Sequence, residues 1–390
     1  MLSASNLLRR RRHFRRAAAS RAFEEVKYGG VWETSPASEL GWPYPDTTAA
    51  VDASIAARSL IDGPVTSVRY YLRDEAANGP LQYAAIRAWR DNDAASLDAY
   101  TPVGQSTLPN SQIPHATWVS LDNPIEIQAG DSIGLTFQRQ GAERLATYGA
   151  SGAGKLHFAN GEKLAAGDWP YTSTNSYLIA EFRGWKPDVL TYGDSVTIGA
   201  SLTGSQWSGA LNSDFYAAGR RSIDCNFAGL IRARIGAAAS MNCGLGSQTA
   251  AWGESQWTTR VSAYAAPGAC VVACFGFNDA IAEMPIATHQ GHWAAMQAAA
   301  AAGGLTLARM SLYHVADGYT AGGHDADYWN TEFDAYNTAM ASWCSANGLQ
   351  NIDVSSVIND SLLAQEPGDY IHPTSAGYAA LADAIAAAIN

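Results

Sequence analysis

Three short motifs contain the side-chain types that acyl transfer by a serine needs. Gly193-Asp194-Ser195 offers a hydroxyl, Gly276-Phe277-Asn278-Asp279 offers an amide, and Asp369-x-x-His372 offers a carboxylate and an imidazole. A serine hydroxyl is a weak nucleophile until a neighbouring base accepts its proton, and an imidazole, with a pKa of about 6.5 in peptides, suits that task. A carboxylate three residues away is close enough to hold one imidazole tautomer. The sequence therefore predicts a triad of Ser195, His372 and Asp369.

The same chemistry requires hydrogen-bond donors. Attack on an acyl carbon places negative charge on the carbonyl oxygen, so donors must already point at that position. The candidates are the backbone N–H of Ser195, the side chain of Asn278 and a backbone N–H in the turn 244–247. Within that turn Gly246 and Ser247 are both candidates, and the sequence does not say which N–H points inward.

The elements that must position these groups alternate between two types. Apolar, β-favouring runs precede the motifs, as Val189 to Tyr192 and Val271 to Phe275 show, and stretches of helical periodicity lie between them. This alternation predicts a doubly wound, three-layer α/β domain of flavodoxin-like type, whose active residues meet at the carboxyl ends of its strands. We expect strands ending near 193, 242, 275, 313 and 354, and helices near 222–235, 254–265, 287–302, 333–343 and 378–385.

The three motifs, taken in order, resemble the sequence blocks of the SGNH hydrolases, also called the GDSL esterase family. The resemblance covers residues 187–390 and implies a serine esterase with Ser195 as nucleophile, His372 as base, Asp369 as its orienting partner and Asn278 as an oxyanion donor. Two positions depart from the pattern. Val196 stands where many members have leucine, and Ser247 stands where members usually have the oxyanion glycine, with Gly246 one residue earlier.

Between residues 28 and 184 the apolar residues recur with a period of two. Ile133, Leu135 and Phe137 alternate with Gly134, Thr136 and Gln138, which predicts an all-β sandwich of short strands. The strand, Ala-Gly-Asp turn and strand at 125–137 resemble the jelly-roll modules that accompany carbohydrate-active enzymes. That resemblance makes this segment a candidate carbohydrate-binding domain, and its candidate sugar-stacking residues, with core packing as the alternative, are Trp42, Trp89 and Trp118.

Charge is unevenly distributed along the 390 residues. Seven arginines and no acidic residue fall within the first 21 residues, so the remainder carries 18 basic and 36 acidic side chains. We therefore expect a basic arm at 1–27, the β-sandwich at 28–184 and the hydrolase domain at 185–390, with no surface for nucleic acid on the body of the chain. Arg16 is followed by too short an apolar run for a conventional signal peptide, and no run is long enough to span a membrane.

No metal or cofactor is expected. The five cysteines lack C-x-x-C spacing, and no carboxylate or cysteine cluster accompanies His289 and His292, which have helical spacing.

The sequence thus predicts a metal-independent serine esterase that removes O-acetyl groups from a polysaccharide or another glycan. One alternative is a lipase or thioesterase acting on other acyl esters, with the β-domain as a scaffold. The other is a phage tail or spike component, in which the basic arm docks on a larger assembly and the esterase acts on a bacterial surface glycan. The expected partner is an acylated glycan or a small ester, and the expected location is extracellular or on a virion.

Overall fold

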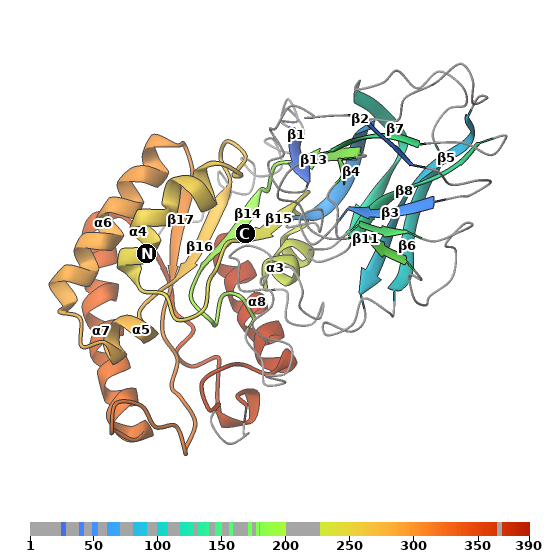
Figure 1. Cartoon of the computed structure of the whole chain (residues 1–390). Coiled ribbons are helices and arrows are strands. Elements are labelled where there is room, and N and C mark those ends of the chain that lie inside the picture. Colours follow the sequence, from blue (N-terminus) through green and yellow to red (C-terminus); the bar gives the residue numbers. More distant parts are fainter. Residues whose placement is uncertain are drawn as a thin grey trace. The chain divides into compact units, whose positions relative to one another are not determined.

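The computed structural model describes residues 180–199, 227–364 and 369–390, together with separate strands between 25 and 178 (Figure 1). The chain forms two compact units, one with the strands from Glu25 to Trp185 and the other with the described elements from Lys186 onward. Within these described ranges no helix has the length and apolar character needed to cross a membrane.

The first unit consists of antiparallel strands. Burial alternates along the strand that ends at Ile127, because Ile125 and Ile127 are buried while Glu126 between them is exposed. Hydrogen-bonded neighbours form three groups of strands. The first contains, in order, β1 (Glu25–Tyr28), β13 (Ala180–Trp185), β4 (Ile61–Tyr70) and β7 (Trp118–Ile127). The second contains β11 (Tyr171–Ser173), β10 (Leu156–Phe158), β3 (Ala49–Ala53), β8 (Ser132–Arg139), β5 (Leu81–Asp91) and β6 (Tyr100–Thr107), and the third contains β12 (Tyr177–Leu178), β9 (Leu145–Gly149) and β2 (Glu39–Trp42).

The packing of these strands into a jelly-roll sandwich stays a prediction. Trp42, Trp89 and Trp118 lie in β2, β5 and β7, and their side chains lie outside the part of the chain that the structure describes. Residues 1–24 of the basic arm expected at 1–27 also lie outside the described part of the chain. The remaining three residues of that range belong to β1, which begins at Glu25.

The second unit is built on a parallel sheet. Its strands run in the order β15 (Ser240–Asn242), β14 (Val189–Gly193), β16 (Cys270–Cys274), β17 (Thr306–Met310) and β18 (Gln350–Ile352), and each neighbouring pair is parallel. In order along the chain this is 2-1-3-4-5, the flavodoxin-like arrangement. The predicted α/β fold is confirmed for this unit, and all five expected strands are present.

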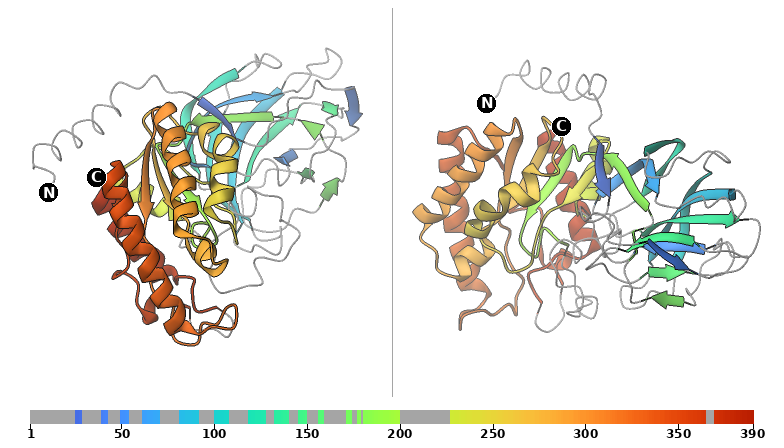
Figure 2. Two further views of the ribbon diagram at one scale, coloured as in Figure 1. Left: turned by 90° about the vertical axis from the view of Figure 1, so that its left-hand side faces the viewer. Right: turned by 45° about the horizontal axis from the view of Figure 1, so that its top comes forward.

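Helices cover both faces of this sheet. On one face lie α3 (Phe227–Ile235) and α8 (Ser375–Ile389), and on the other lie α4 (Ala250–Trp257), α6 (Ile286–Ala302) and α7 (Ala326–Asn347), as Figures 1 and 2 show. Every residue of β14 and β16 is buried, which is the pattern of strands covered on both sides. The connection from β14 to α3 passes through residues outside the described range.

Two helical elements differ from the sequence expectation. The helix expected near 254–265 begins at Ala250 and passes at Thr258 into a short π-helix, Thr258–Ser262, and a short helix not expected at all, α5, spans Phe277–Ile281. The early start of α4 has a long-range cause. Thr249 makes no side-chain cap, and the carboxylate of Asp279 accepts the hydrogen bond of the Ala250 N–H at 3.0 Å instead.

The turn after β14 depends on the missing side chain of Gly193. A Cβ atom placed there would lie 2.1 Å from the carbonyl oxygen of Cys274 in β16 and 2.2 Å from Oγ1 of Thr197. Such distances are far below van der Waals contact, so the turn that carries Ser195 packs this closely on β16 only with glycine.

We expect Gly193→Ala to lower the free energy of unfolding by about 3 kcal/mol or more, because the new methyl group overlaps backbone that cannot move freely. The matched control is Gly291→Ala in α6, where an added Cβ meets no atom within 4 Å. That variant should gain about 0.5–1 kcal/mol from helix propensity. Urea unfolding of both variants checks the pair, and equal stability of the two would contradict the packing described.

Candidate active site

Ser195 stands at the start of a tight turn directly after β14. The carboxylate of Asp194 accepts a hydrogen bond from the Val196 N–H at 3.0 Å, and the Ile198 N–H donates to the Asp194 carbonyl at 3.1 Å. Val196, Thr197 and Ile198 are buried, whereas Ser195 is half-buried. The turn therefore presents the serine hydroxyl at the carboxyl end of the sheet.

His372 lies in the loop before α8, and this loop is held on both sides. Before it, Oδ1 of Asp369 accepts hydrogen bonds from the N–H groups of Ile371 at 3.3 Å and His372 at 3.1 Å. After it, Pro373 pairs with Leu363 in an isolated β-bridge, and the N–H of Ala364 donates to the His372 carbonyl at 3.0 Å. The backbone around the imidazole is thus fixed by neighbours outside the motif as well as within it.

The side chains of Ser195, His372 and Asp369 form a continuous hydrogen-bonded chain. Nε2 of His372 lies 2.8 Å from Oγ of Ser195, and Nδ1 lies 2.9 Å from both carboxylate oxygens of Asp369. Burial alone would raise the pKa of Asp369, but the hydrogen bonds and charge of His372 and the backbone N–H groups lower it below its usual value. An ionised carboxylate keeps the imidazole proton on Nδ1 and leaves Nε2 able to accept the serine proton.

Asn278 lies in α5, directly after β16, and contacts both the turn after β15 and the turn that carries Ser195. Its Nδ2 donates to the Gln248 carbonyl at 3.0 Å and lies 3.4 Å from Oδ2 of Asp194. The second contact is at the long limit of a hydrogen bond, so the hydrogen that makes it is only weakly bound. The structure brings Asn278 beside the serine turn, with one of its two hydrogens committed to Gln248.

The turn after β15 is held by Asn242, which the sequence reading did not assign to the site. Its Nδ2 donates to the Thr197 carbonyl at 2.7 Å, and its Oδ1 accepts from the Gly244 N–H at 3.0 Å. The Leu245 N–H donates to the carbonyl of Gly193 at 2.9 Å. The one signal for Asn242 in the sequence is its position at the end of a predicted strand. Its side-chain amide connects the turn after β15 to the turn that carries Ser195.

Three backbone N–H groups remain available at this place. Among the residues that the structure describes, none accepts a hydrogen bond from the N–H of Ser195, Gly246 or Ser247. Gly246 is adjacent to the serine, since a Cβ atom added to it would lie 4.0 Å from Cβ of Ser195. Ser247 has a φ of 62°, in the left-handed region that favours glycine.

A buried polar network lies next to Asn278, around the side chain of Asp279. His289 is fully buried, its Nδ1 lies 3.0 Å from Oδ1 of Asp279, and its Nε2 accepts a hydrogen bond from the indole N–H of Trp293 at 3.0 Å. Because the indole only donates, Nε2 carries no proton, and the neutral ring donates to Asp279 from Nδ1. Nδ1 of His292 contacts the carboxylate of Glu254 at 2.6 Å. Across the described ranges, no three His, Cys, Asp or Glu side chains gather as metal ligands would.

Asp194 is a fully buried carboxyl group that accepts hydrogen bonds from backbone N–H groups of its own turn, those of Val196 and Thr197 among them. Burial raises its pKa to about 7; the Val196 N–H opposes this rise, and the negative charge of Asp279 adds to it. The side chain is fully buried, and its contact with Asn278 is long. Asp194 therefore holds its proton over a pH range in which an exposed aspartate is ionised.

Comparison with known proteins places most of the second unit in one family model. The model of the GDSL-like lipase/acylhydrolase family matches residues 191–380, a range that contains Ser195, Asn278, Asp369 and His372. Among curated proteins, no sequence matches the chain.

Solved structures are similar to about half of the chain. A G-D-S-L family protein from Desulfitobacterium hafniense is 21% identical, with 51% of this chain and 98% of that chain covered and a TM-score of 0.37. A GDSL-like lipase from Bacteroides thetaiotaomicron is 17% identical, with 52% and 86% covered and a TM-score of 0.37. An acetylxylan esterase from Geobacillus stearothermophilus is 17% identical, with 52% and 93% covered and a TM-score of 0.39.

We expect Ser247→Gly to raise the free energy of unfolding by about 0.5–1 kcal/mol, because glycine adopts the left-handed conformation without the steric cost of a Cβ atom. Ester hydrolysis should persist, since the backbone N–H is unchanged. Glu283→Gly, at a φ of 53° outside these loops, is the matched control and should stabilise by a similar amount. Loss of stability in Ser247→Gly alone would show that the serine side chain has a bonding role.

Asp194→Asn should change how stability depends on pH. Between about pH 4, the value for an unfolded aspartate, and about pH 7 the folded state retains a proton that the unfolded state releases, so the contribution of Asp194 to stability falls as pH rises. The asparagine does not titrate, so the variant should gain stability relative to the wild type across that window. Urea unfolding at several pH values measures this difference, with the exposed Asp327→Asn as control; a constant difference would contradict the raised pKa.

Proposed function

We propose that the chain hydrolyses carboxylic esters with Ser195 as its nucleophile, a proposal supported by the match of residues 191–380 to the model of the GDSL-like lipase/acylhydrolase family. The observation that carries the proposal is the 2.8 Å contact between Nε2 of His372 and the serine hydroxyl, with Asp369 on the other ring nitrogen. No metal or cofactor has a part in the proposed reaction.

In the first half-reaction the serine Oγ forms a bond to the acyl carbon while its proton passes to Nε2 of His372. The ionised Asp369 carboxylate stabilises the imidazolium that results. The C–O bond to the leaving alcohol then breaks, and the alcohol oxygen receives the proton from Nε2. A water molecule repeats the sequence on the acyl-enzyme, which releases the carboxylic acid and restores Ser195.

The negative charge on the carbonyl oxygen is stabilised by donors from three loops. We assign the Ser195 N–H, the Nδ2 hydrogen of Asn278 that is not bonded to Gln248, and an N–H of the turn at Gly246 and Ser247. Of these two, Gly246 lies beside the serine, and Ser247 has the left-handed backbone conformation. Preorganised donors of this kind supply a large part of the rate enhancement in acyl transfer.

For the substrate we propose an O-acetylated polysaccharide or other glycan. The support is the strand-rich segment 28–184, with its resemblance to carbohydrate-associated modules and its candidate sugar-stacking residues Trp42, Trp89 and Trp118. Docking of the basic arm on a larger assembly, and an extracellular or virion location, belong to the same proposal.

Ser195→Ala should reduce acetate release from acetylated polysaccharides by at least about 10³-fold without loss of stability, because no other described group replaces the hydroxyl. Acetate is measured over a panel of acetylated glycans, with p-nitrophenyl esters of increasing chain length in parallel. Ser255→Ala, which removes an exposed hydroxyl bonded to its own helix, is the control.

Two results would overturn parts of this proposal. Turnover retained by Ser195→Ala would reject the nucleophile. Hydrolysis of long-chain p-nitrophenyl esters in preference to the acetyl ester, with no acetate from any glycan, would favour a lipase or thioesterase.

A further inference from the structure

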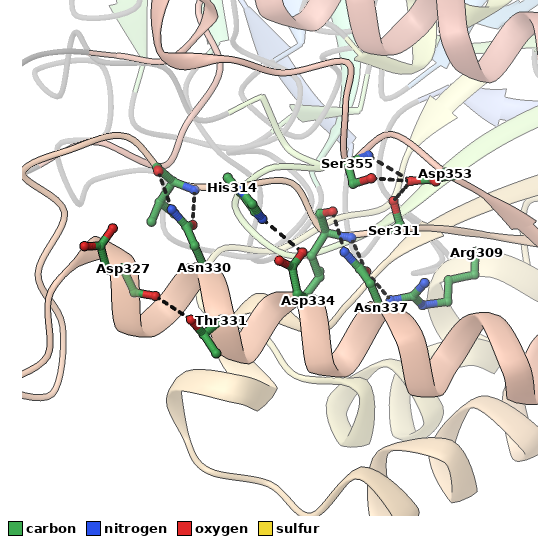
Figure 3. Close-up of polar contacts among 12 residues, drawn as sticks. Arg309, Ser311, His314, Asp327, Asn330, Thr331, Asp334, Asn337, Asp353 and Ser355 are labelled. Carbon is green, nitrogen blue, oxygen red and sulfur yellow. Dashed lines mark hydrogen bonds and ion pairs between the residues drawn. The ribbon is translucent and has the colours of Figure 1, made fainter.

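Three polar side chains of α7 face the loop that follows β17. Asn330, Asp334 and Asn337 are spaced by four and three residues, so they lie on one stripe of the helix. Figure 3 shows all three directed toward residues 311–316, which form neither helix nor strand. A loop of this kind has backbone groups that the sheet does not satisfy, and the stripe supplies partners for them.

Asn330 and Asn337, which we call the asparagine clamp, each bind both polar groups of one loop residue. Oδ1 of Asn337 accepts from the Leu312 N–H at 2.9 Å, and its Nδ2 donates to the Leu312 carbonyl at 2.8 Å. Oδ1 of Asn330 accepts from the Val315 N–H at 2.8 Å, and its Nδ2 donates to the Val315 carbonyl at 3.1 Å. Each side-chain amide thus pairs with the N–H and the carbonyl of its loop residue as a neighbouring strand would in a sheet.

A buried arginine determines which way the Asn337 amide points. Arg309 is fully buried in β17, and its guanidinium donates to Oδ1 of Asn337 at 3.2 Å and to Oδ1 of Asn351 at 2.7 Å. A guanidinium only donates, so the atom it contacts on Asn337 must be the oxygen. Nδ2 then faces the Leu312 carbonyl, and the clamp is held in a single orientation.

The clamped loop in turn holds the loop of the histidine. The hydroxyl of Tyr313, a fully buried residue, donates to the Ile371 carbonyl at 2.8 Å, and the Ala316 N–H donates to the Tyr370 carbonyl at 2.9 Å. These two carbonyls belong to the residues directly before His372. Each clamped residue, Leu312 or Val315, is thus adjacent in sequence to a residue that holds the histidine loop.

We propose that Asn330 and Asn337 are positioning residues for His372, acting through the loop 312–316. They touch no reacting atom, and their role rests on the function proposed above. A small displacement of a catalytic group from its productive geometry costs as much as about 100-fold in rate. The clamp maintains the 2.8 Å contact between Nε2 and the serine hydroxyl.

The third member of the stripe does not belong to the clamp. Asp334 lies 2.9 Å from Nε2 of His314, and Figure 3 shows this contact between the two asparagines, but the side chains are 59% and 48% exposed. A solvent-exposed ion pair contributes little to holding a loop.

The test replaces each asparagine singly by its isosteric acid, Asn330→Asp and Asn337→Asp. The carboxylate still accepts the loop N–H but repels the carbonyl that Nδ2 bound. At position 337 the negative charge faces Arg309, which compensates it, whereas at position 330 it has Asp327 and Asp334 as neighbours one turn away on the same helix. Asn337→Asp is therefore the variant that keeps more of its stability. We expect kcat for p-nitrophenyl acetate to fall by about 10- to 100-fold with KM nearly unchanged, at a temperature where both variants are folded.

A spectroscopic readout separates this proposal from the proposed function. The proton on Nδ1 of His372, bonded to Asp369, gives a low-field NMR resonance that His372→Gln assigns by its loss. In both clamp variants this resonance should shift or broaden. If wild-type protein hydrolyses no ester, the proposed function fails, yet the resonance still reports whether the clamp positions the ring.

Asn347→Asp is the matched control, because that exposed amide donates to the Trp343 carbonyl of its own helix and contacts no residue of the loop 312–316 among those that the structure describes. It should leave kcat and the resonance unchanged. The proposal is overturned if both clamp variants keep wild-type kcat and the wild-type resonance, whether or not their melting temperatures fall. Equal losses in the control and the clamp variants would likewise reject it in favour of a general effect on α7.

Discussion

The peptide unit between Gly193 and Asp194 joins the loops on which the active site depends. Its carbonyl accepts the Leu245 N–H at 2.9 Å, and its N–H donates to the Cys274 carbonyl at 3.3 Å. One side therefore holds the turn after β15, and the other holds the end of β16. This arrangement requires close approach of backbone to backbone, which only a glycine at 193 allows.

Near this peptide unit lie two buried carboxyl groups, Asp279 and Asp194, and each accepts hydrogen bonds from neighbouring donors. Asp279 accepts hydrogen bonds from the Ala250 N–H and from His289, while burial raises the pKa of Asp194 to about 7 although backbone N–H groups of its turn donate to it. Placing two carboxyl groups in an interior of low dielectric is costly unless each finds a partner or keeps its proton. Asp279 finds its partners in Ala250 and His289, burial raises the pKa of Asp194, and Asn278 is left with one weakly bound hydrogen.

Much of this site is readable in the sequence, because the chemistry needs particular residue types and the strands that deliver them are apolar. Ser195, His372 and Asp369 follow from that reasoning, as do the parallel strands and most helix positions. Asn242, the early start of α4 and the asparagine clamp do not, because each depends on a partner far along the chain. An asparagine that braces two loops has the same local sequence signal as one exposed to water. The β-strand segment illustrates the same limit, since alternation predicts strands but not which sheets face each other.

The hydroxyl and the imidazole that meet in the site are separated by 177 residues. β14 is the first described strand of the second unit and lies between β15 and β16 in its sheet, whereas His372 comes just before α8. During synthesis the Ser195 hydroxyl therefore emerges from the ribosome long before the His372 imidazole does. Under the function proposed above, the nascent chain hydrolyses no ester until the segment that carries His372 has folded against the sheet.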